Sequence, residues 1–263
     1  MKVIGTVESL WRYPVKSMRG EEMPELFAGF AGVYGDRLFA FRSSASPSGF
    51  PFLTARNQRQ MLCYRPRFRQ PEKTVAPPHL SEAEQMAPGA TPVYAEPADL
   101  MLDVATPAGE TLAIDDPALL DLLRAGIDKP HELTLLRSER ALTDCRPLSL
   151  ISLQTVRQLA GEIGCEMDKR RFRANIYLDL ASKEGFSEGQ FVGRSLCLGP
   201  KAVIAILQRD PRCMIITLDP ETGEKKPIVL KTVAQAHGGM AGIYAAVLSE
   251  GMIRKGDAVR LQD

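Results

Sequence analysis

Turn-forming residues divide the chain into many short apolar runs, and this pattern limits the possible fold more than any other feature. Such runs have the length of β-strands, and the Gly, Pro and Asp residues between them mark turns. Strands are expected at Val3–Trp11, Leu38–Phe41, Met101–Val104, Thr111–Ile114, Leu196–Leu198, Val203–Leu207, Met214–Leu218, Tyr244–Leu248 and Ala258–Leu261. Many short strands with few helices predict a mainly β protein with some α, built as a β-barrel with helical decoration.

Helix signals begin only after residue 115. Asp116 and Pro117 predict a helix start and Gly126 its end, with an apolar face of Leu119, Leu120, Leu122 and Leu123. A second helix is expected from the N-cap Ser152 to Gly164, with Leu153, Val156, Leu159 and Ile163 on one face. A short third helix is expected at Leu230–Ala236, and residues 70–92 predict a mobile or poorly packed surface excursion. The change near residue 115 predicts two domains, 1–115 and 116–263.

Charge and cysteine content exclude several classes of protein. The 263 residues carry 33 Lys and Arg against 32 Asp and Glu, so the net charge of +1 gives no reason to expect nucleic-acid binding. No apolar run reaches the roughly 18 residues of a membrane span, and the first residues lack the apolar stretch of a signal peptide. Five cysteines, an odd number without a C-x-x-C pair, favour a reducing compartment and a cytoplasmic protein.

Positive charge is locally concentrated although the total is balanced. One cluster contains Arg56, Arg59, Arg65, Arg67, Arg69 and Lys73 against the single acid Glu72, and a second spans residues 169–173. The simple interpretation is a solvated strand face. The alternative is that some of these side chains converge on a small anion, because the planar guanidinium binds phosphate or carboxylate with two hydrogen bonds.

Three further features are candidates for chemistry, and each has a purely structural alternative. Lys16 and Ser17 follow Pro14 and offer a charge and a hydroxyl to a phosphate, although most such pairs are merely exposed. Ser152 opens a helix whose N-terminus attracts anions, although most such serines are only caps. Cys213 follows Arg212 in a setting that favours a thiolate, which is a nucleophile or a soft-metal ligand.

Together these pieces resemble the MOSC family, named for the molybdenum-cofactor sulfurase C-terminal domain. The similarity is to the branch with an N-terminal β-barrel domain, which includes the amidoxime-reducing components. It rests on six blocks in order: Tyr13–Ser17, Gly35–Arg37, Leu53–Arg56, Phe172–Ile176, Arg212–Gly223 and Gly251–Asp257. The resemblance implies a β-barrel MOSC domain at 116–263 after an N-terminal β-barrel-like domain at 1–115.

The resemblance also implies a molybdopterin-type molybdenum cofactor held between the two halves of the chain. Carried over by position, Cys213 would bind the metal. Asp210, which lies close to Cys213 in the sequence, is a candidate to assist proton delivery or substrate choice. The cofactor-binding set would be Lys16, Ser17, Arg37, Arg56, Ser152, Arg173, Asn175 and Arg212. Ala174 stands where relatives often have Pro and Asp210 where some have a second Cys, which leaves the substrate preference open.

By this resemblance the protein is expected to be a molybdenum-dependent reductase of small N-hydroxylated compounds such as hydroxylaminopurines and amidoximes. The chain has no cysteine run for an iron–sulfur cluster, so electrons are expected from a separate donor protein. No nucleic-acid or membrane partner is expected. Two alternatives remain open: a non-catalytic carrier of the molybdenum cofactor or of sulfur, and a metal-free β-barrel binding module with one reactive thiol.

Overall fold

The chain folds into two compact units in the computed structural model, which describes residues 1–85, 96–127 and 132–262. Unit 1 contains Met1–Arg12, Glu21–Val33 and Thr143–Asp263, and unit 2 contains Tyr13–Gly20 and Tyr34–Leu142. The units are therefore interleaved along the sequence, because the chain leaves unit 1 twice before residue 143. The single boundary expected after residue 115 stays a prediction.

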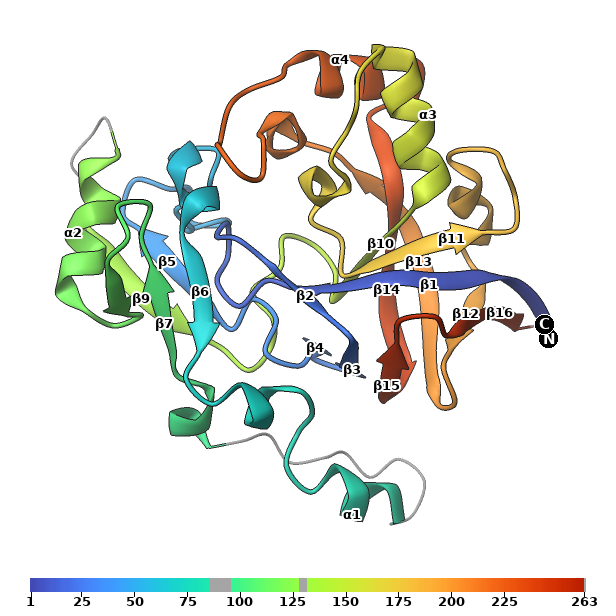
Figure 1. Ribbon diagram of the computed structural model, residues 1–263, viewed down its shortest axis with the longest axis horizontal. Helices are drawn as coiled ribbons and strands as arrows, with labels where there is room; N and C mark the ends of the chain where they lie inside the picture. The colour runs from blue at the N-terminus through green and yellow to red at the C-terminus, as the bar shows by residue number, and fades with distance from the viewer. Residues whose placement is uncertain (86–95, 128–131, 263) are drawn as a thin grey trace. The chain divides into compact units, whose positions relative to one another are not determined.

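Unit 1 is built on a closed seven-stranded barrel. Its strand order is β11-β10-β14-β13-β12-β16-β1, and β1 pairs back onto β11 to close the ring (Figure 1). The strands are β1 Lys2–Arg12, β10 Leu148–Ser152, β11 Ile176–Leu180, β12 Ser195–Leu198, β13 Ala202–Pro211, β14 Met240–Ser249 and β16 Ala258–Gln262. A short strand, β2 (Glu21–Met23), pairs antiparallel with the last residues of β1. The expectation of a mainly β fold with a barrel is confirmed.

Alternating aliphatic side chains fill the barrel. Leu196 and Leu198 on β12 and Ile204 and Ile206 on β13 all belong to one buried cluster, two residues apart on each strand. This is the period at which successive side chains point to the same face of a strand. β10 contributes Leu148 and Leu150 to the cluster but is buried along its whole length. A smaller sheet in this unit has the order β15-β3-β4, with β3 Glu25–Gly29, β4 Gly32–Val33 and β15 Gly251–Arg254.

The helices of unit 1 follow the local signals of the sequence. Helix α3 spans Leu153–Ile163, with the Ser152 hydroxyl accepting a hydrogen bond from the Thr155 amide and Gly164 ending the helix at φ 72°. Helix α4 spans Ile228–Ala236. Both helices confirm the expectations. Three 3₁₀-helices complete the unit: η4 Lys169–Phe172, η5 Ser187–Phe191 and η6 Met214–Thr217.

The expected strand at Met214–Leu218 is wrong, because most of this segment is the 3₁₀-helix η6. The Ile216 amide donates to the Cys213 carbonyl at 3.3 Å, and the Leu218 amide donates to the Ile215 carbonyl at 3.0 Å. Ile216 and Thr217 are buried. A short apolar run shows that a segment is buried, but it does not distinguish a strand from a turn of helix.

Unit 2 contains two small sheets. One pairs β5 (Phe39–Ser43) with β9 (Leu133–Arg137), and the other has the order β6-β7-β8, with β6 Arg65–Phe68, β7 Leu102–Ala105 and β8 Thr111–Ala113. Its helical segments are η1 Arg59–Cys63, η2 Pro71–Thr74, α1 Leu80–Gln85, η3 Pro97–Leu100 and α2 Pro117–Ala125. The strands expected at Met101–Val104 and Thr111–Ile114 are confirmed as β7 and β8, which pair antiparallel. No helix among the described residues is long and apolar enough to cross a membrane.

Two expectations for unit 2 are modified. Helix α2 starts at the cap Asp116 as predicted, but only Leu119 and Leu123 of its four leucines are buried, and Leu122 is 38% exposed. The excursion expected at residues 70–92 contains η2 and α1, and its last residues, 86–92, lie outside the described part of the chain.

Candidate functional site

Unit 2 brings Lys16 and Arg56 onto the same aromatic ring. The Lys16 ammonium lies 5.0 Å from the centre of the Phe50 ring and 4.9 Å from that of Phe52, and the Arg56 guanidinium lies 4.6 Å from the Phe50 ring. Lys16 is buried and also donates a 2.8 Å hydrogen bond to the Leu142 carbonyl. Cation–π contacts hold both charges in defined positions.

Arg37 is linked to Lys16 through the backbone of Leu142. The Arg37 carbonyl accepts a 2.9 Å hydrogen bond from the amide of Leu142, whose own carbonyl accepts from Lys16. The Arg37 guanidinium stacks 4.5 Å from the Tyr13 ring and pairs with Asp36 at 2.6 Å. Lys16, Arg37 and Arg56 form what we call the cationic cluster. An excess of cations of this kind suits a phosphate-bearing ligand.

Left-handed backbone is concentrated at residues that the sequence analysis selected. The structure shows a positive φ at five non-glycine residues among those described, and three of these are Ser17 at 66°, Arg37 at 44° and Arg173 at 51°. Such a conformation is uncommon outside glycine, and strained backbone of this kind clusters at functional sites. Nothing in the sequence indicates the strain, because neither Ser nor Arg is a residue that prefers it.

Unit 1 gathers a second polar group around the buried carboxylate of Asp210. The Ser149 hydroxyl donates to Asp210 Oδ2 at 2.9 Å, and Arg212 Nη2 lies 2.8 Å from the same oxygen. The Tyr244 hydroxyl forms a further side-chain hydrogen bond with Asp210. Ser149, Asp210, Arg212 and Tyr244 form the Asp210 cluster. Ser149 and Tyr244 are not among the residues predicted from the sequence, since only the pairing of β10, β13 and β14 brings them to Asp210.

Burial dominates the electrostatics of the Asp210 cluster. Burial raises the pKa of Asp210 above its ordinary value, although Arg212 and the hydroxyls of Ser149 and Tyr244 act in the opposite direction. Burial, followed by the negative charge of Asp210, raises the pKa of Tyr244. Asp210 Oδ1 and Arg212 Nη2 have no hydrogen-bond partner among the described residues, so the ion pair is close but not aligned as a hydrogen bond. Buried polar atoms without partners mark a place where a ligand or water is expected.

The raised pKa of Asp210 predicts a specific pH dependence of stability. A carboxyl whose pKa is higher in the folded state stabilises the fold below its unfolded pKa, ordinarily 3.8, and this contribution is lost as the pH rises through the folded pKa. Each unit of that rise is worth about 1.4 kcal/mol. The variant Asp210→Asn cannot ionise at this position. Its free energy of unfolding is therefore expected to fall less between pH 4 and neutrality than that of the unchanged protein. Urea unfolding of both proteins at a series of pH values measures this difference. Parallel curves for the two proteins would contradict this assignment.

The strand β14 closes tightly over Arg212. Arg212 Nε donates to the Ala241 carbonyl at 2.6 Å, and Nη1 donates to the Phe172 carbonyl at 3.0 Å. Gly242 has a φ of 82°, and a Cβ added there would lie 2.5 Å from the Leu150 carbonyl oxygen and 2.9 Å from Arg212 Nη2. Only glycine therefore fits beside this guanidinium.

Cys213 lies two residues after the barrel strand β13 and caps the start of η6. The residue is partly buried, and no disulfide involves it. The amide of the preceding Arg212 donates to the Gly239 carbonyl at 2.8 Å, which fixes the backbone before the thiol. No group of three or more His, Cys, Asp or Glu side chains that could hold a metal is found in the part of the chain that the structure describes.

Asn175 and Ser152 have structural tasks in this geometry. Asn175 Oδ1 accepts from the Ser149 amide, and its Nδ2 donates to the Trp11 carbonyl, both at 3.3 Å, so the side chain ties β10 to β1. The Ser152 hydroxyl donates to the buried Glu188 carboxylate at 2.8 Å. The N-terminus of α3 thus already has a carboxylate beside it, which does not favour Ser152 as an anion site. Asn175 acts by positioning the backbone of Ser149.

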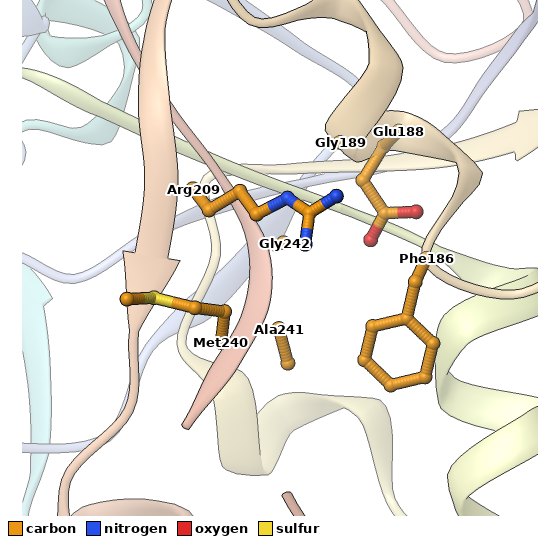
Figure 2. Close-up of a pocket in the computed structure, with 7 residues that line it drawn as sticks. All are labelled: Phe186, Glu188, Gly189, Arg209, Met240, Ala241 and Gly242. Carbon is orange, nitrogen blue, oxygen red and sulfur yellow. The ribbon is translucent and has the colours of Figure 1, made fainter. Parts of the chain in front are cut away.

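A pocket in unit 1 lies beside β13 and β14, on the face of these strands opposite to the Asp210 cluster. Figure 2 shows the Arg209 guanidinium and the Glu188 carboxylate pointing toward each other, with the Phe186 ring beside them. The remaining lining residues are Gly189, Met240, Ala241 and Gly242. Arg209 and Asp210 are consecutive on β13 and therefore point to opposite faces. None of the predicted site residues lines this pocket.

Two family patterns and several solved structures are similar to this chain. The MOSC N-terminal beta barrel domain matches residues 4–99, and the MOSC domain matches residues 137–260. The YUAD protein from Bacillus subtilis is 13% identical at a TM-score of 0.47, covering 97% of this chain and 93% of that one. YiiM from Geobacillus stearothermophilus is 20% identical at 0.36, and YiiM from Escherichia coli is 18% identical at 0.33. Each of the two YiiM matches covers 45% of this chain and 55% of the YiiM chain. This chain therefore spans about half the length of the YiiM proteins. No curated protein matches.

Proposed function

This chain belongs to the MOSC family, in which a MOSC domain follows a MOSC N-terminal beta barrel domain, and from that premise we propose that it is a molybdenum-cofactor-dependent reductase of N-hydroxylated compounds. The family is associated with binding of the molybdenum cofactor. The observation that carries the proposal is the set of residues: in unit 2 a cationic cluster in which Arg37 has a left-handed backbone, and in unit 1 a partly buried cysteine that follows a fixed arginine.

The chemistry of these residues suits a phosphorylated dithiolene cofactor. Lys16, Arg37 and Arg56 offer charge to its phosphate, and Ser17, in its left-handed conformation, offers an amide and a hydroxyl next to Lys16. Cys213 offers the soft sulfur that molybdenum accepts as a ligand. In unit 1 Arg212 Nη2, which is ion-paired with Asp210, is a buried donor with no hydrogen-bond acceptor among the described residues. When bound, the cofactor supplies a metal centre that takes up two electrons and removes an oxygen atom.

The reaction consumes two electrons and two protons and converts an N-hydroxyl compound into the amine and water. We assign proton storage to Asp210, which burial keeps protonated to a higher pH than an ordinary aspartate. Its Oδ1 has no partner among the described residues, so a proton held there is available for transfer. The Ser149 hydroxyl positions the carboxyl group through Oδ2, and the Tyr244 hydroxyl forms a further hydrogen bond with the carboxyl group. Asp210 and Cys213 thus form the proposed catalytic pair.

The proposed partners are a small N-hydroxylated substrate and a separate electron-donor protein. The proposed compartment is the cytoplasm, where thiols stay reduced. All five cysteines are free in the structure, which supports that environment.

Metal content tests the proposal directly. Protein from a host that makes the cofactor is expected to contain about one molybdenum atom per chain, whereas protein from a cofactor-deficient host should contain none. The double variant Lys16→Gln, Arg56→Gln is expected to lower the content about tenfold, because two of its charge-assisted contacts are lost. Arg124→Gln is the matched control, since this arginine lies on α2 and pairs only with Asp121 among the described residues. Metal near zero in every sample, unchanged by added cofactor, would contradict the proposal.

A second assay separates an enzyme from a carrier. Cofactor-loaded protein, supplied with an artificial electron donor, is expected to reduce benzamidoxime to benzamidine or a hydroxylaminopurine to the aminopurine. Bound molybdenum without turnover of several N-hydroxy compounds would favour the carrier. Neither metal nor turnover would leave the metal-free binding module.

A further inference from the structure

One cysteine outside the candidate site lies against a lysine. Lys226 Nζ is 2.7 Å from Cys165 Sγ, shorter than an ordinary N–H···O hydrogen bond of about 2.9 Å although sulfur is the larger atom. Two other cysteine sulfurs have much longer contacts: Cys145 Sγ lies 3.8 Å from Gln208 Nε2, and Cys197 Sγ lies 3.7 Å from Met1 Sδ. The pair therefore lies closer together than ordinary hydrogen bonding to sulfur requires.

The backbone holds both members of this pair in place. The Cys165 amide donates to the Ala160 carbonyl at 3.1 Å, immediately after the glycine that ends α3. The Lys226 amide donates to the Thr217 carbonyl at 2.7 Å. The neighbouring Lys225 pairs with Leu218 through the backbone in an isolated β-bridge. The two residues are 61 positions apart in sequence, and both belong to unit 1. Their contact is thus part of the fold.

We propose that Cys165 and Lys226 are a redox modification site at which peroxide produces a covalent sulfur–nitrogen link. Hydrogen peroxide first oxidises the thiol to the sulfenic acid and is itself reduced, with release of one water. The neutral Lys226 amine, having given its extra proton to solvent, then attacks the sulfur. Its N–H proton and the sulfenic hydroxyl leave as a second water, and the S–N bond forms. The two steps together oxidise sulfur by two electrons and consume one peroxide.

Proximity makes this step favourable at Cys165 in particular. Sulfenic acids condense with nearby nitrogen or thiol groups, and a nucleophile held within contact distance reacts far faster than one free in solution. Both residues are only partly buried. The link would join the end of α3 to the segment that precedes α4 and that is hydrogen-bonded to η6, the short helix begun by Cys213. The inference does not depend on the proposed reductase activity.

Peptide mass spectrometry tests the link on the intact full-length protein. After reduction, removal of the reductant and treatment with hydrogen peroxide, trypsin is expected to release residues 158–169 joined to residues 226–231. The joined species should weigh less than the two peptides together by two hydrogen atoms, and a thiol reductant should separate them. Because the link closes a long loop, the melting temperature is expected to rise by about 5 °C and to return on reduction.

Two lysine variants give the matched comparison. Lys226→Arg keeps the positive charge but removes the amine, so the joined peptides should disappear and dimedone should instead trap the Cys165 sulfenic acid. Lys225→Arg should leave the link intact. Recovery of Cys165 as a free thiol or as a sulfinic or sulfonic acid, at a peroxide dose that oxidises the exposed Cys145, would overturn the proposal. A joined pair in Lys226→Arg would overturn it as well.

Discussion

Cys213→Ser is expected to lose bound molybdenum at least tenfold and N-hydroxy reduction about a hundredfold, in protein that still folds. Serine has nearly the shape of cysteine, but its hydroxyl is a hard, weakly acidic group and a poor ligand for a metal that selects thiolate. Cys213 is only partly buried, and its carbonyl, not its side chain, makes the hydrogen bond that starts η6. The measurements are elemental analysis and turnover of benzamidoxime, with the melting temperature as the check on folding.

The control for this variant is another free thiol of the same unit. Cys145→Ser changes an exposed cysteine whose nearest described partner is the Gln208 amide. This variant should keep both metal and activity. If Cys213→Ser and Cys213→Ala both retained the metal, Cys213 would not be a ligand, and the cationic cluster would have to hold the cofactor without it.

Gly242→Ala is expected to lower the free energy of unfolding by about 3–5 kcal/mol, the largest effect on stability that we expect from one methyl group in this protein. The new carbon would lie 2.5 Å from a backbone oxygen, that of Leu150, which belongs to a fully buried strand and cannot move aside. It would also lie 2.9 Å from the Arg212 guanidinium and disturb the Asp210 cluster. Urea unfolding measures the loss, and metal content should fall with it.

The variant Gly239→Ala separates the cost of the steric clash at position 242 from the cost of a left-handed backbone. Gly239 has a φ of 78°, close to the 82° of Gly242, but a Cβ there meets nothing within 4 Å. This variant is expected to lose only about 1 kcal/mol, the cost of a left-handed alanine. Equal losses for the two variants would show that conformation alone, rather than the contact with Leu150 and Arg212, makes glycine necessary at position 242.

Local sequence signals predicted the ends of the helices correctly, because short-range hydrogen bonds determine where a helix begins and ends. The caps Asp116 and Ser152 and the terminal Gly164 fix helix ends through bonds to residues only a few positions away, and all three are confirmed. The strands Leu148–Ser152 and Ile176–Leu180 had no such signal. Both are buried on two faces or nearly so, which removes the alternation of polar and apolar residues by which a strand is recognised.

The candidate site divides in the same way. Lys16, Arg37 and Cys213 were found because they lie within short contiguous blocks that resemble a family. Ser149 and Tyr244 were missed because their meeting at Asp210 depends on the register of three strands, with Ser149 and Asp210 61 positions apart. The task of Glu188 beside Ser152 was also hidden, since a buried carboxylate looks like any surface glutamate in the sequence.

The closure of the barrel has a consequence for folding during synthesis. Strand β1 pairs with β16, so Lys2 lies opposite Leu261. Strand β1 is therefore made before the other strands of the barrel, and one of its edges is covered only when β16, the last of them, has been made. During synthesis its apolar side chains, Val7 and Leu10 among them, have no complete core to enter. Contacts so distant in sequence slow folding, and until β16 is made the uncovered edge of β1 is open to pairing with a neighbouring chain.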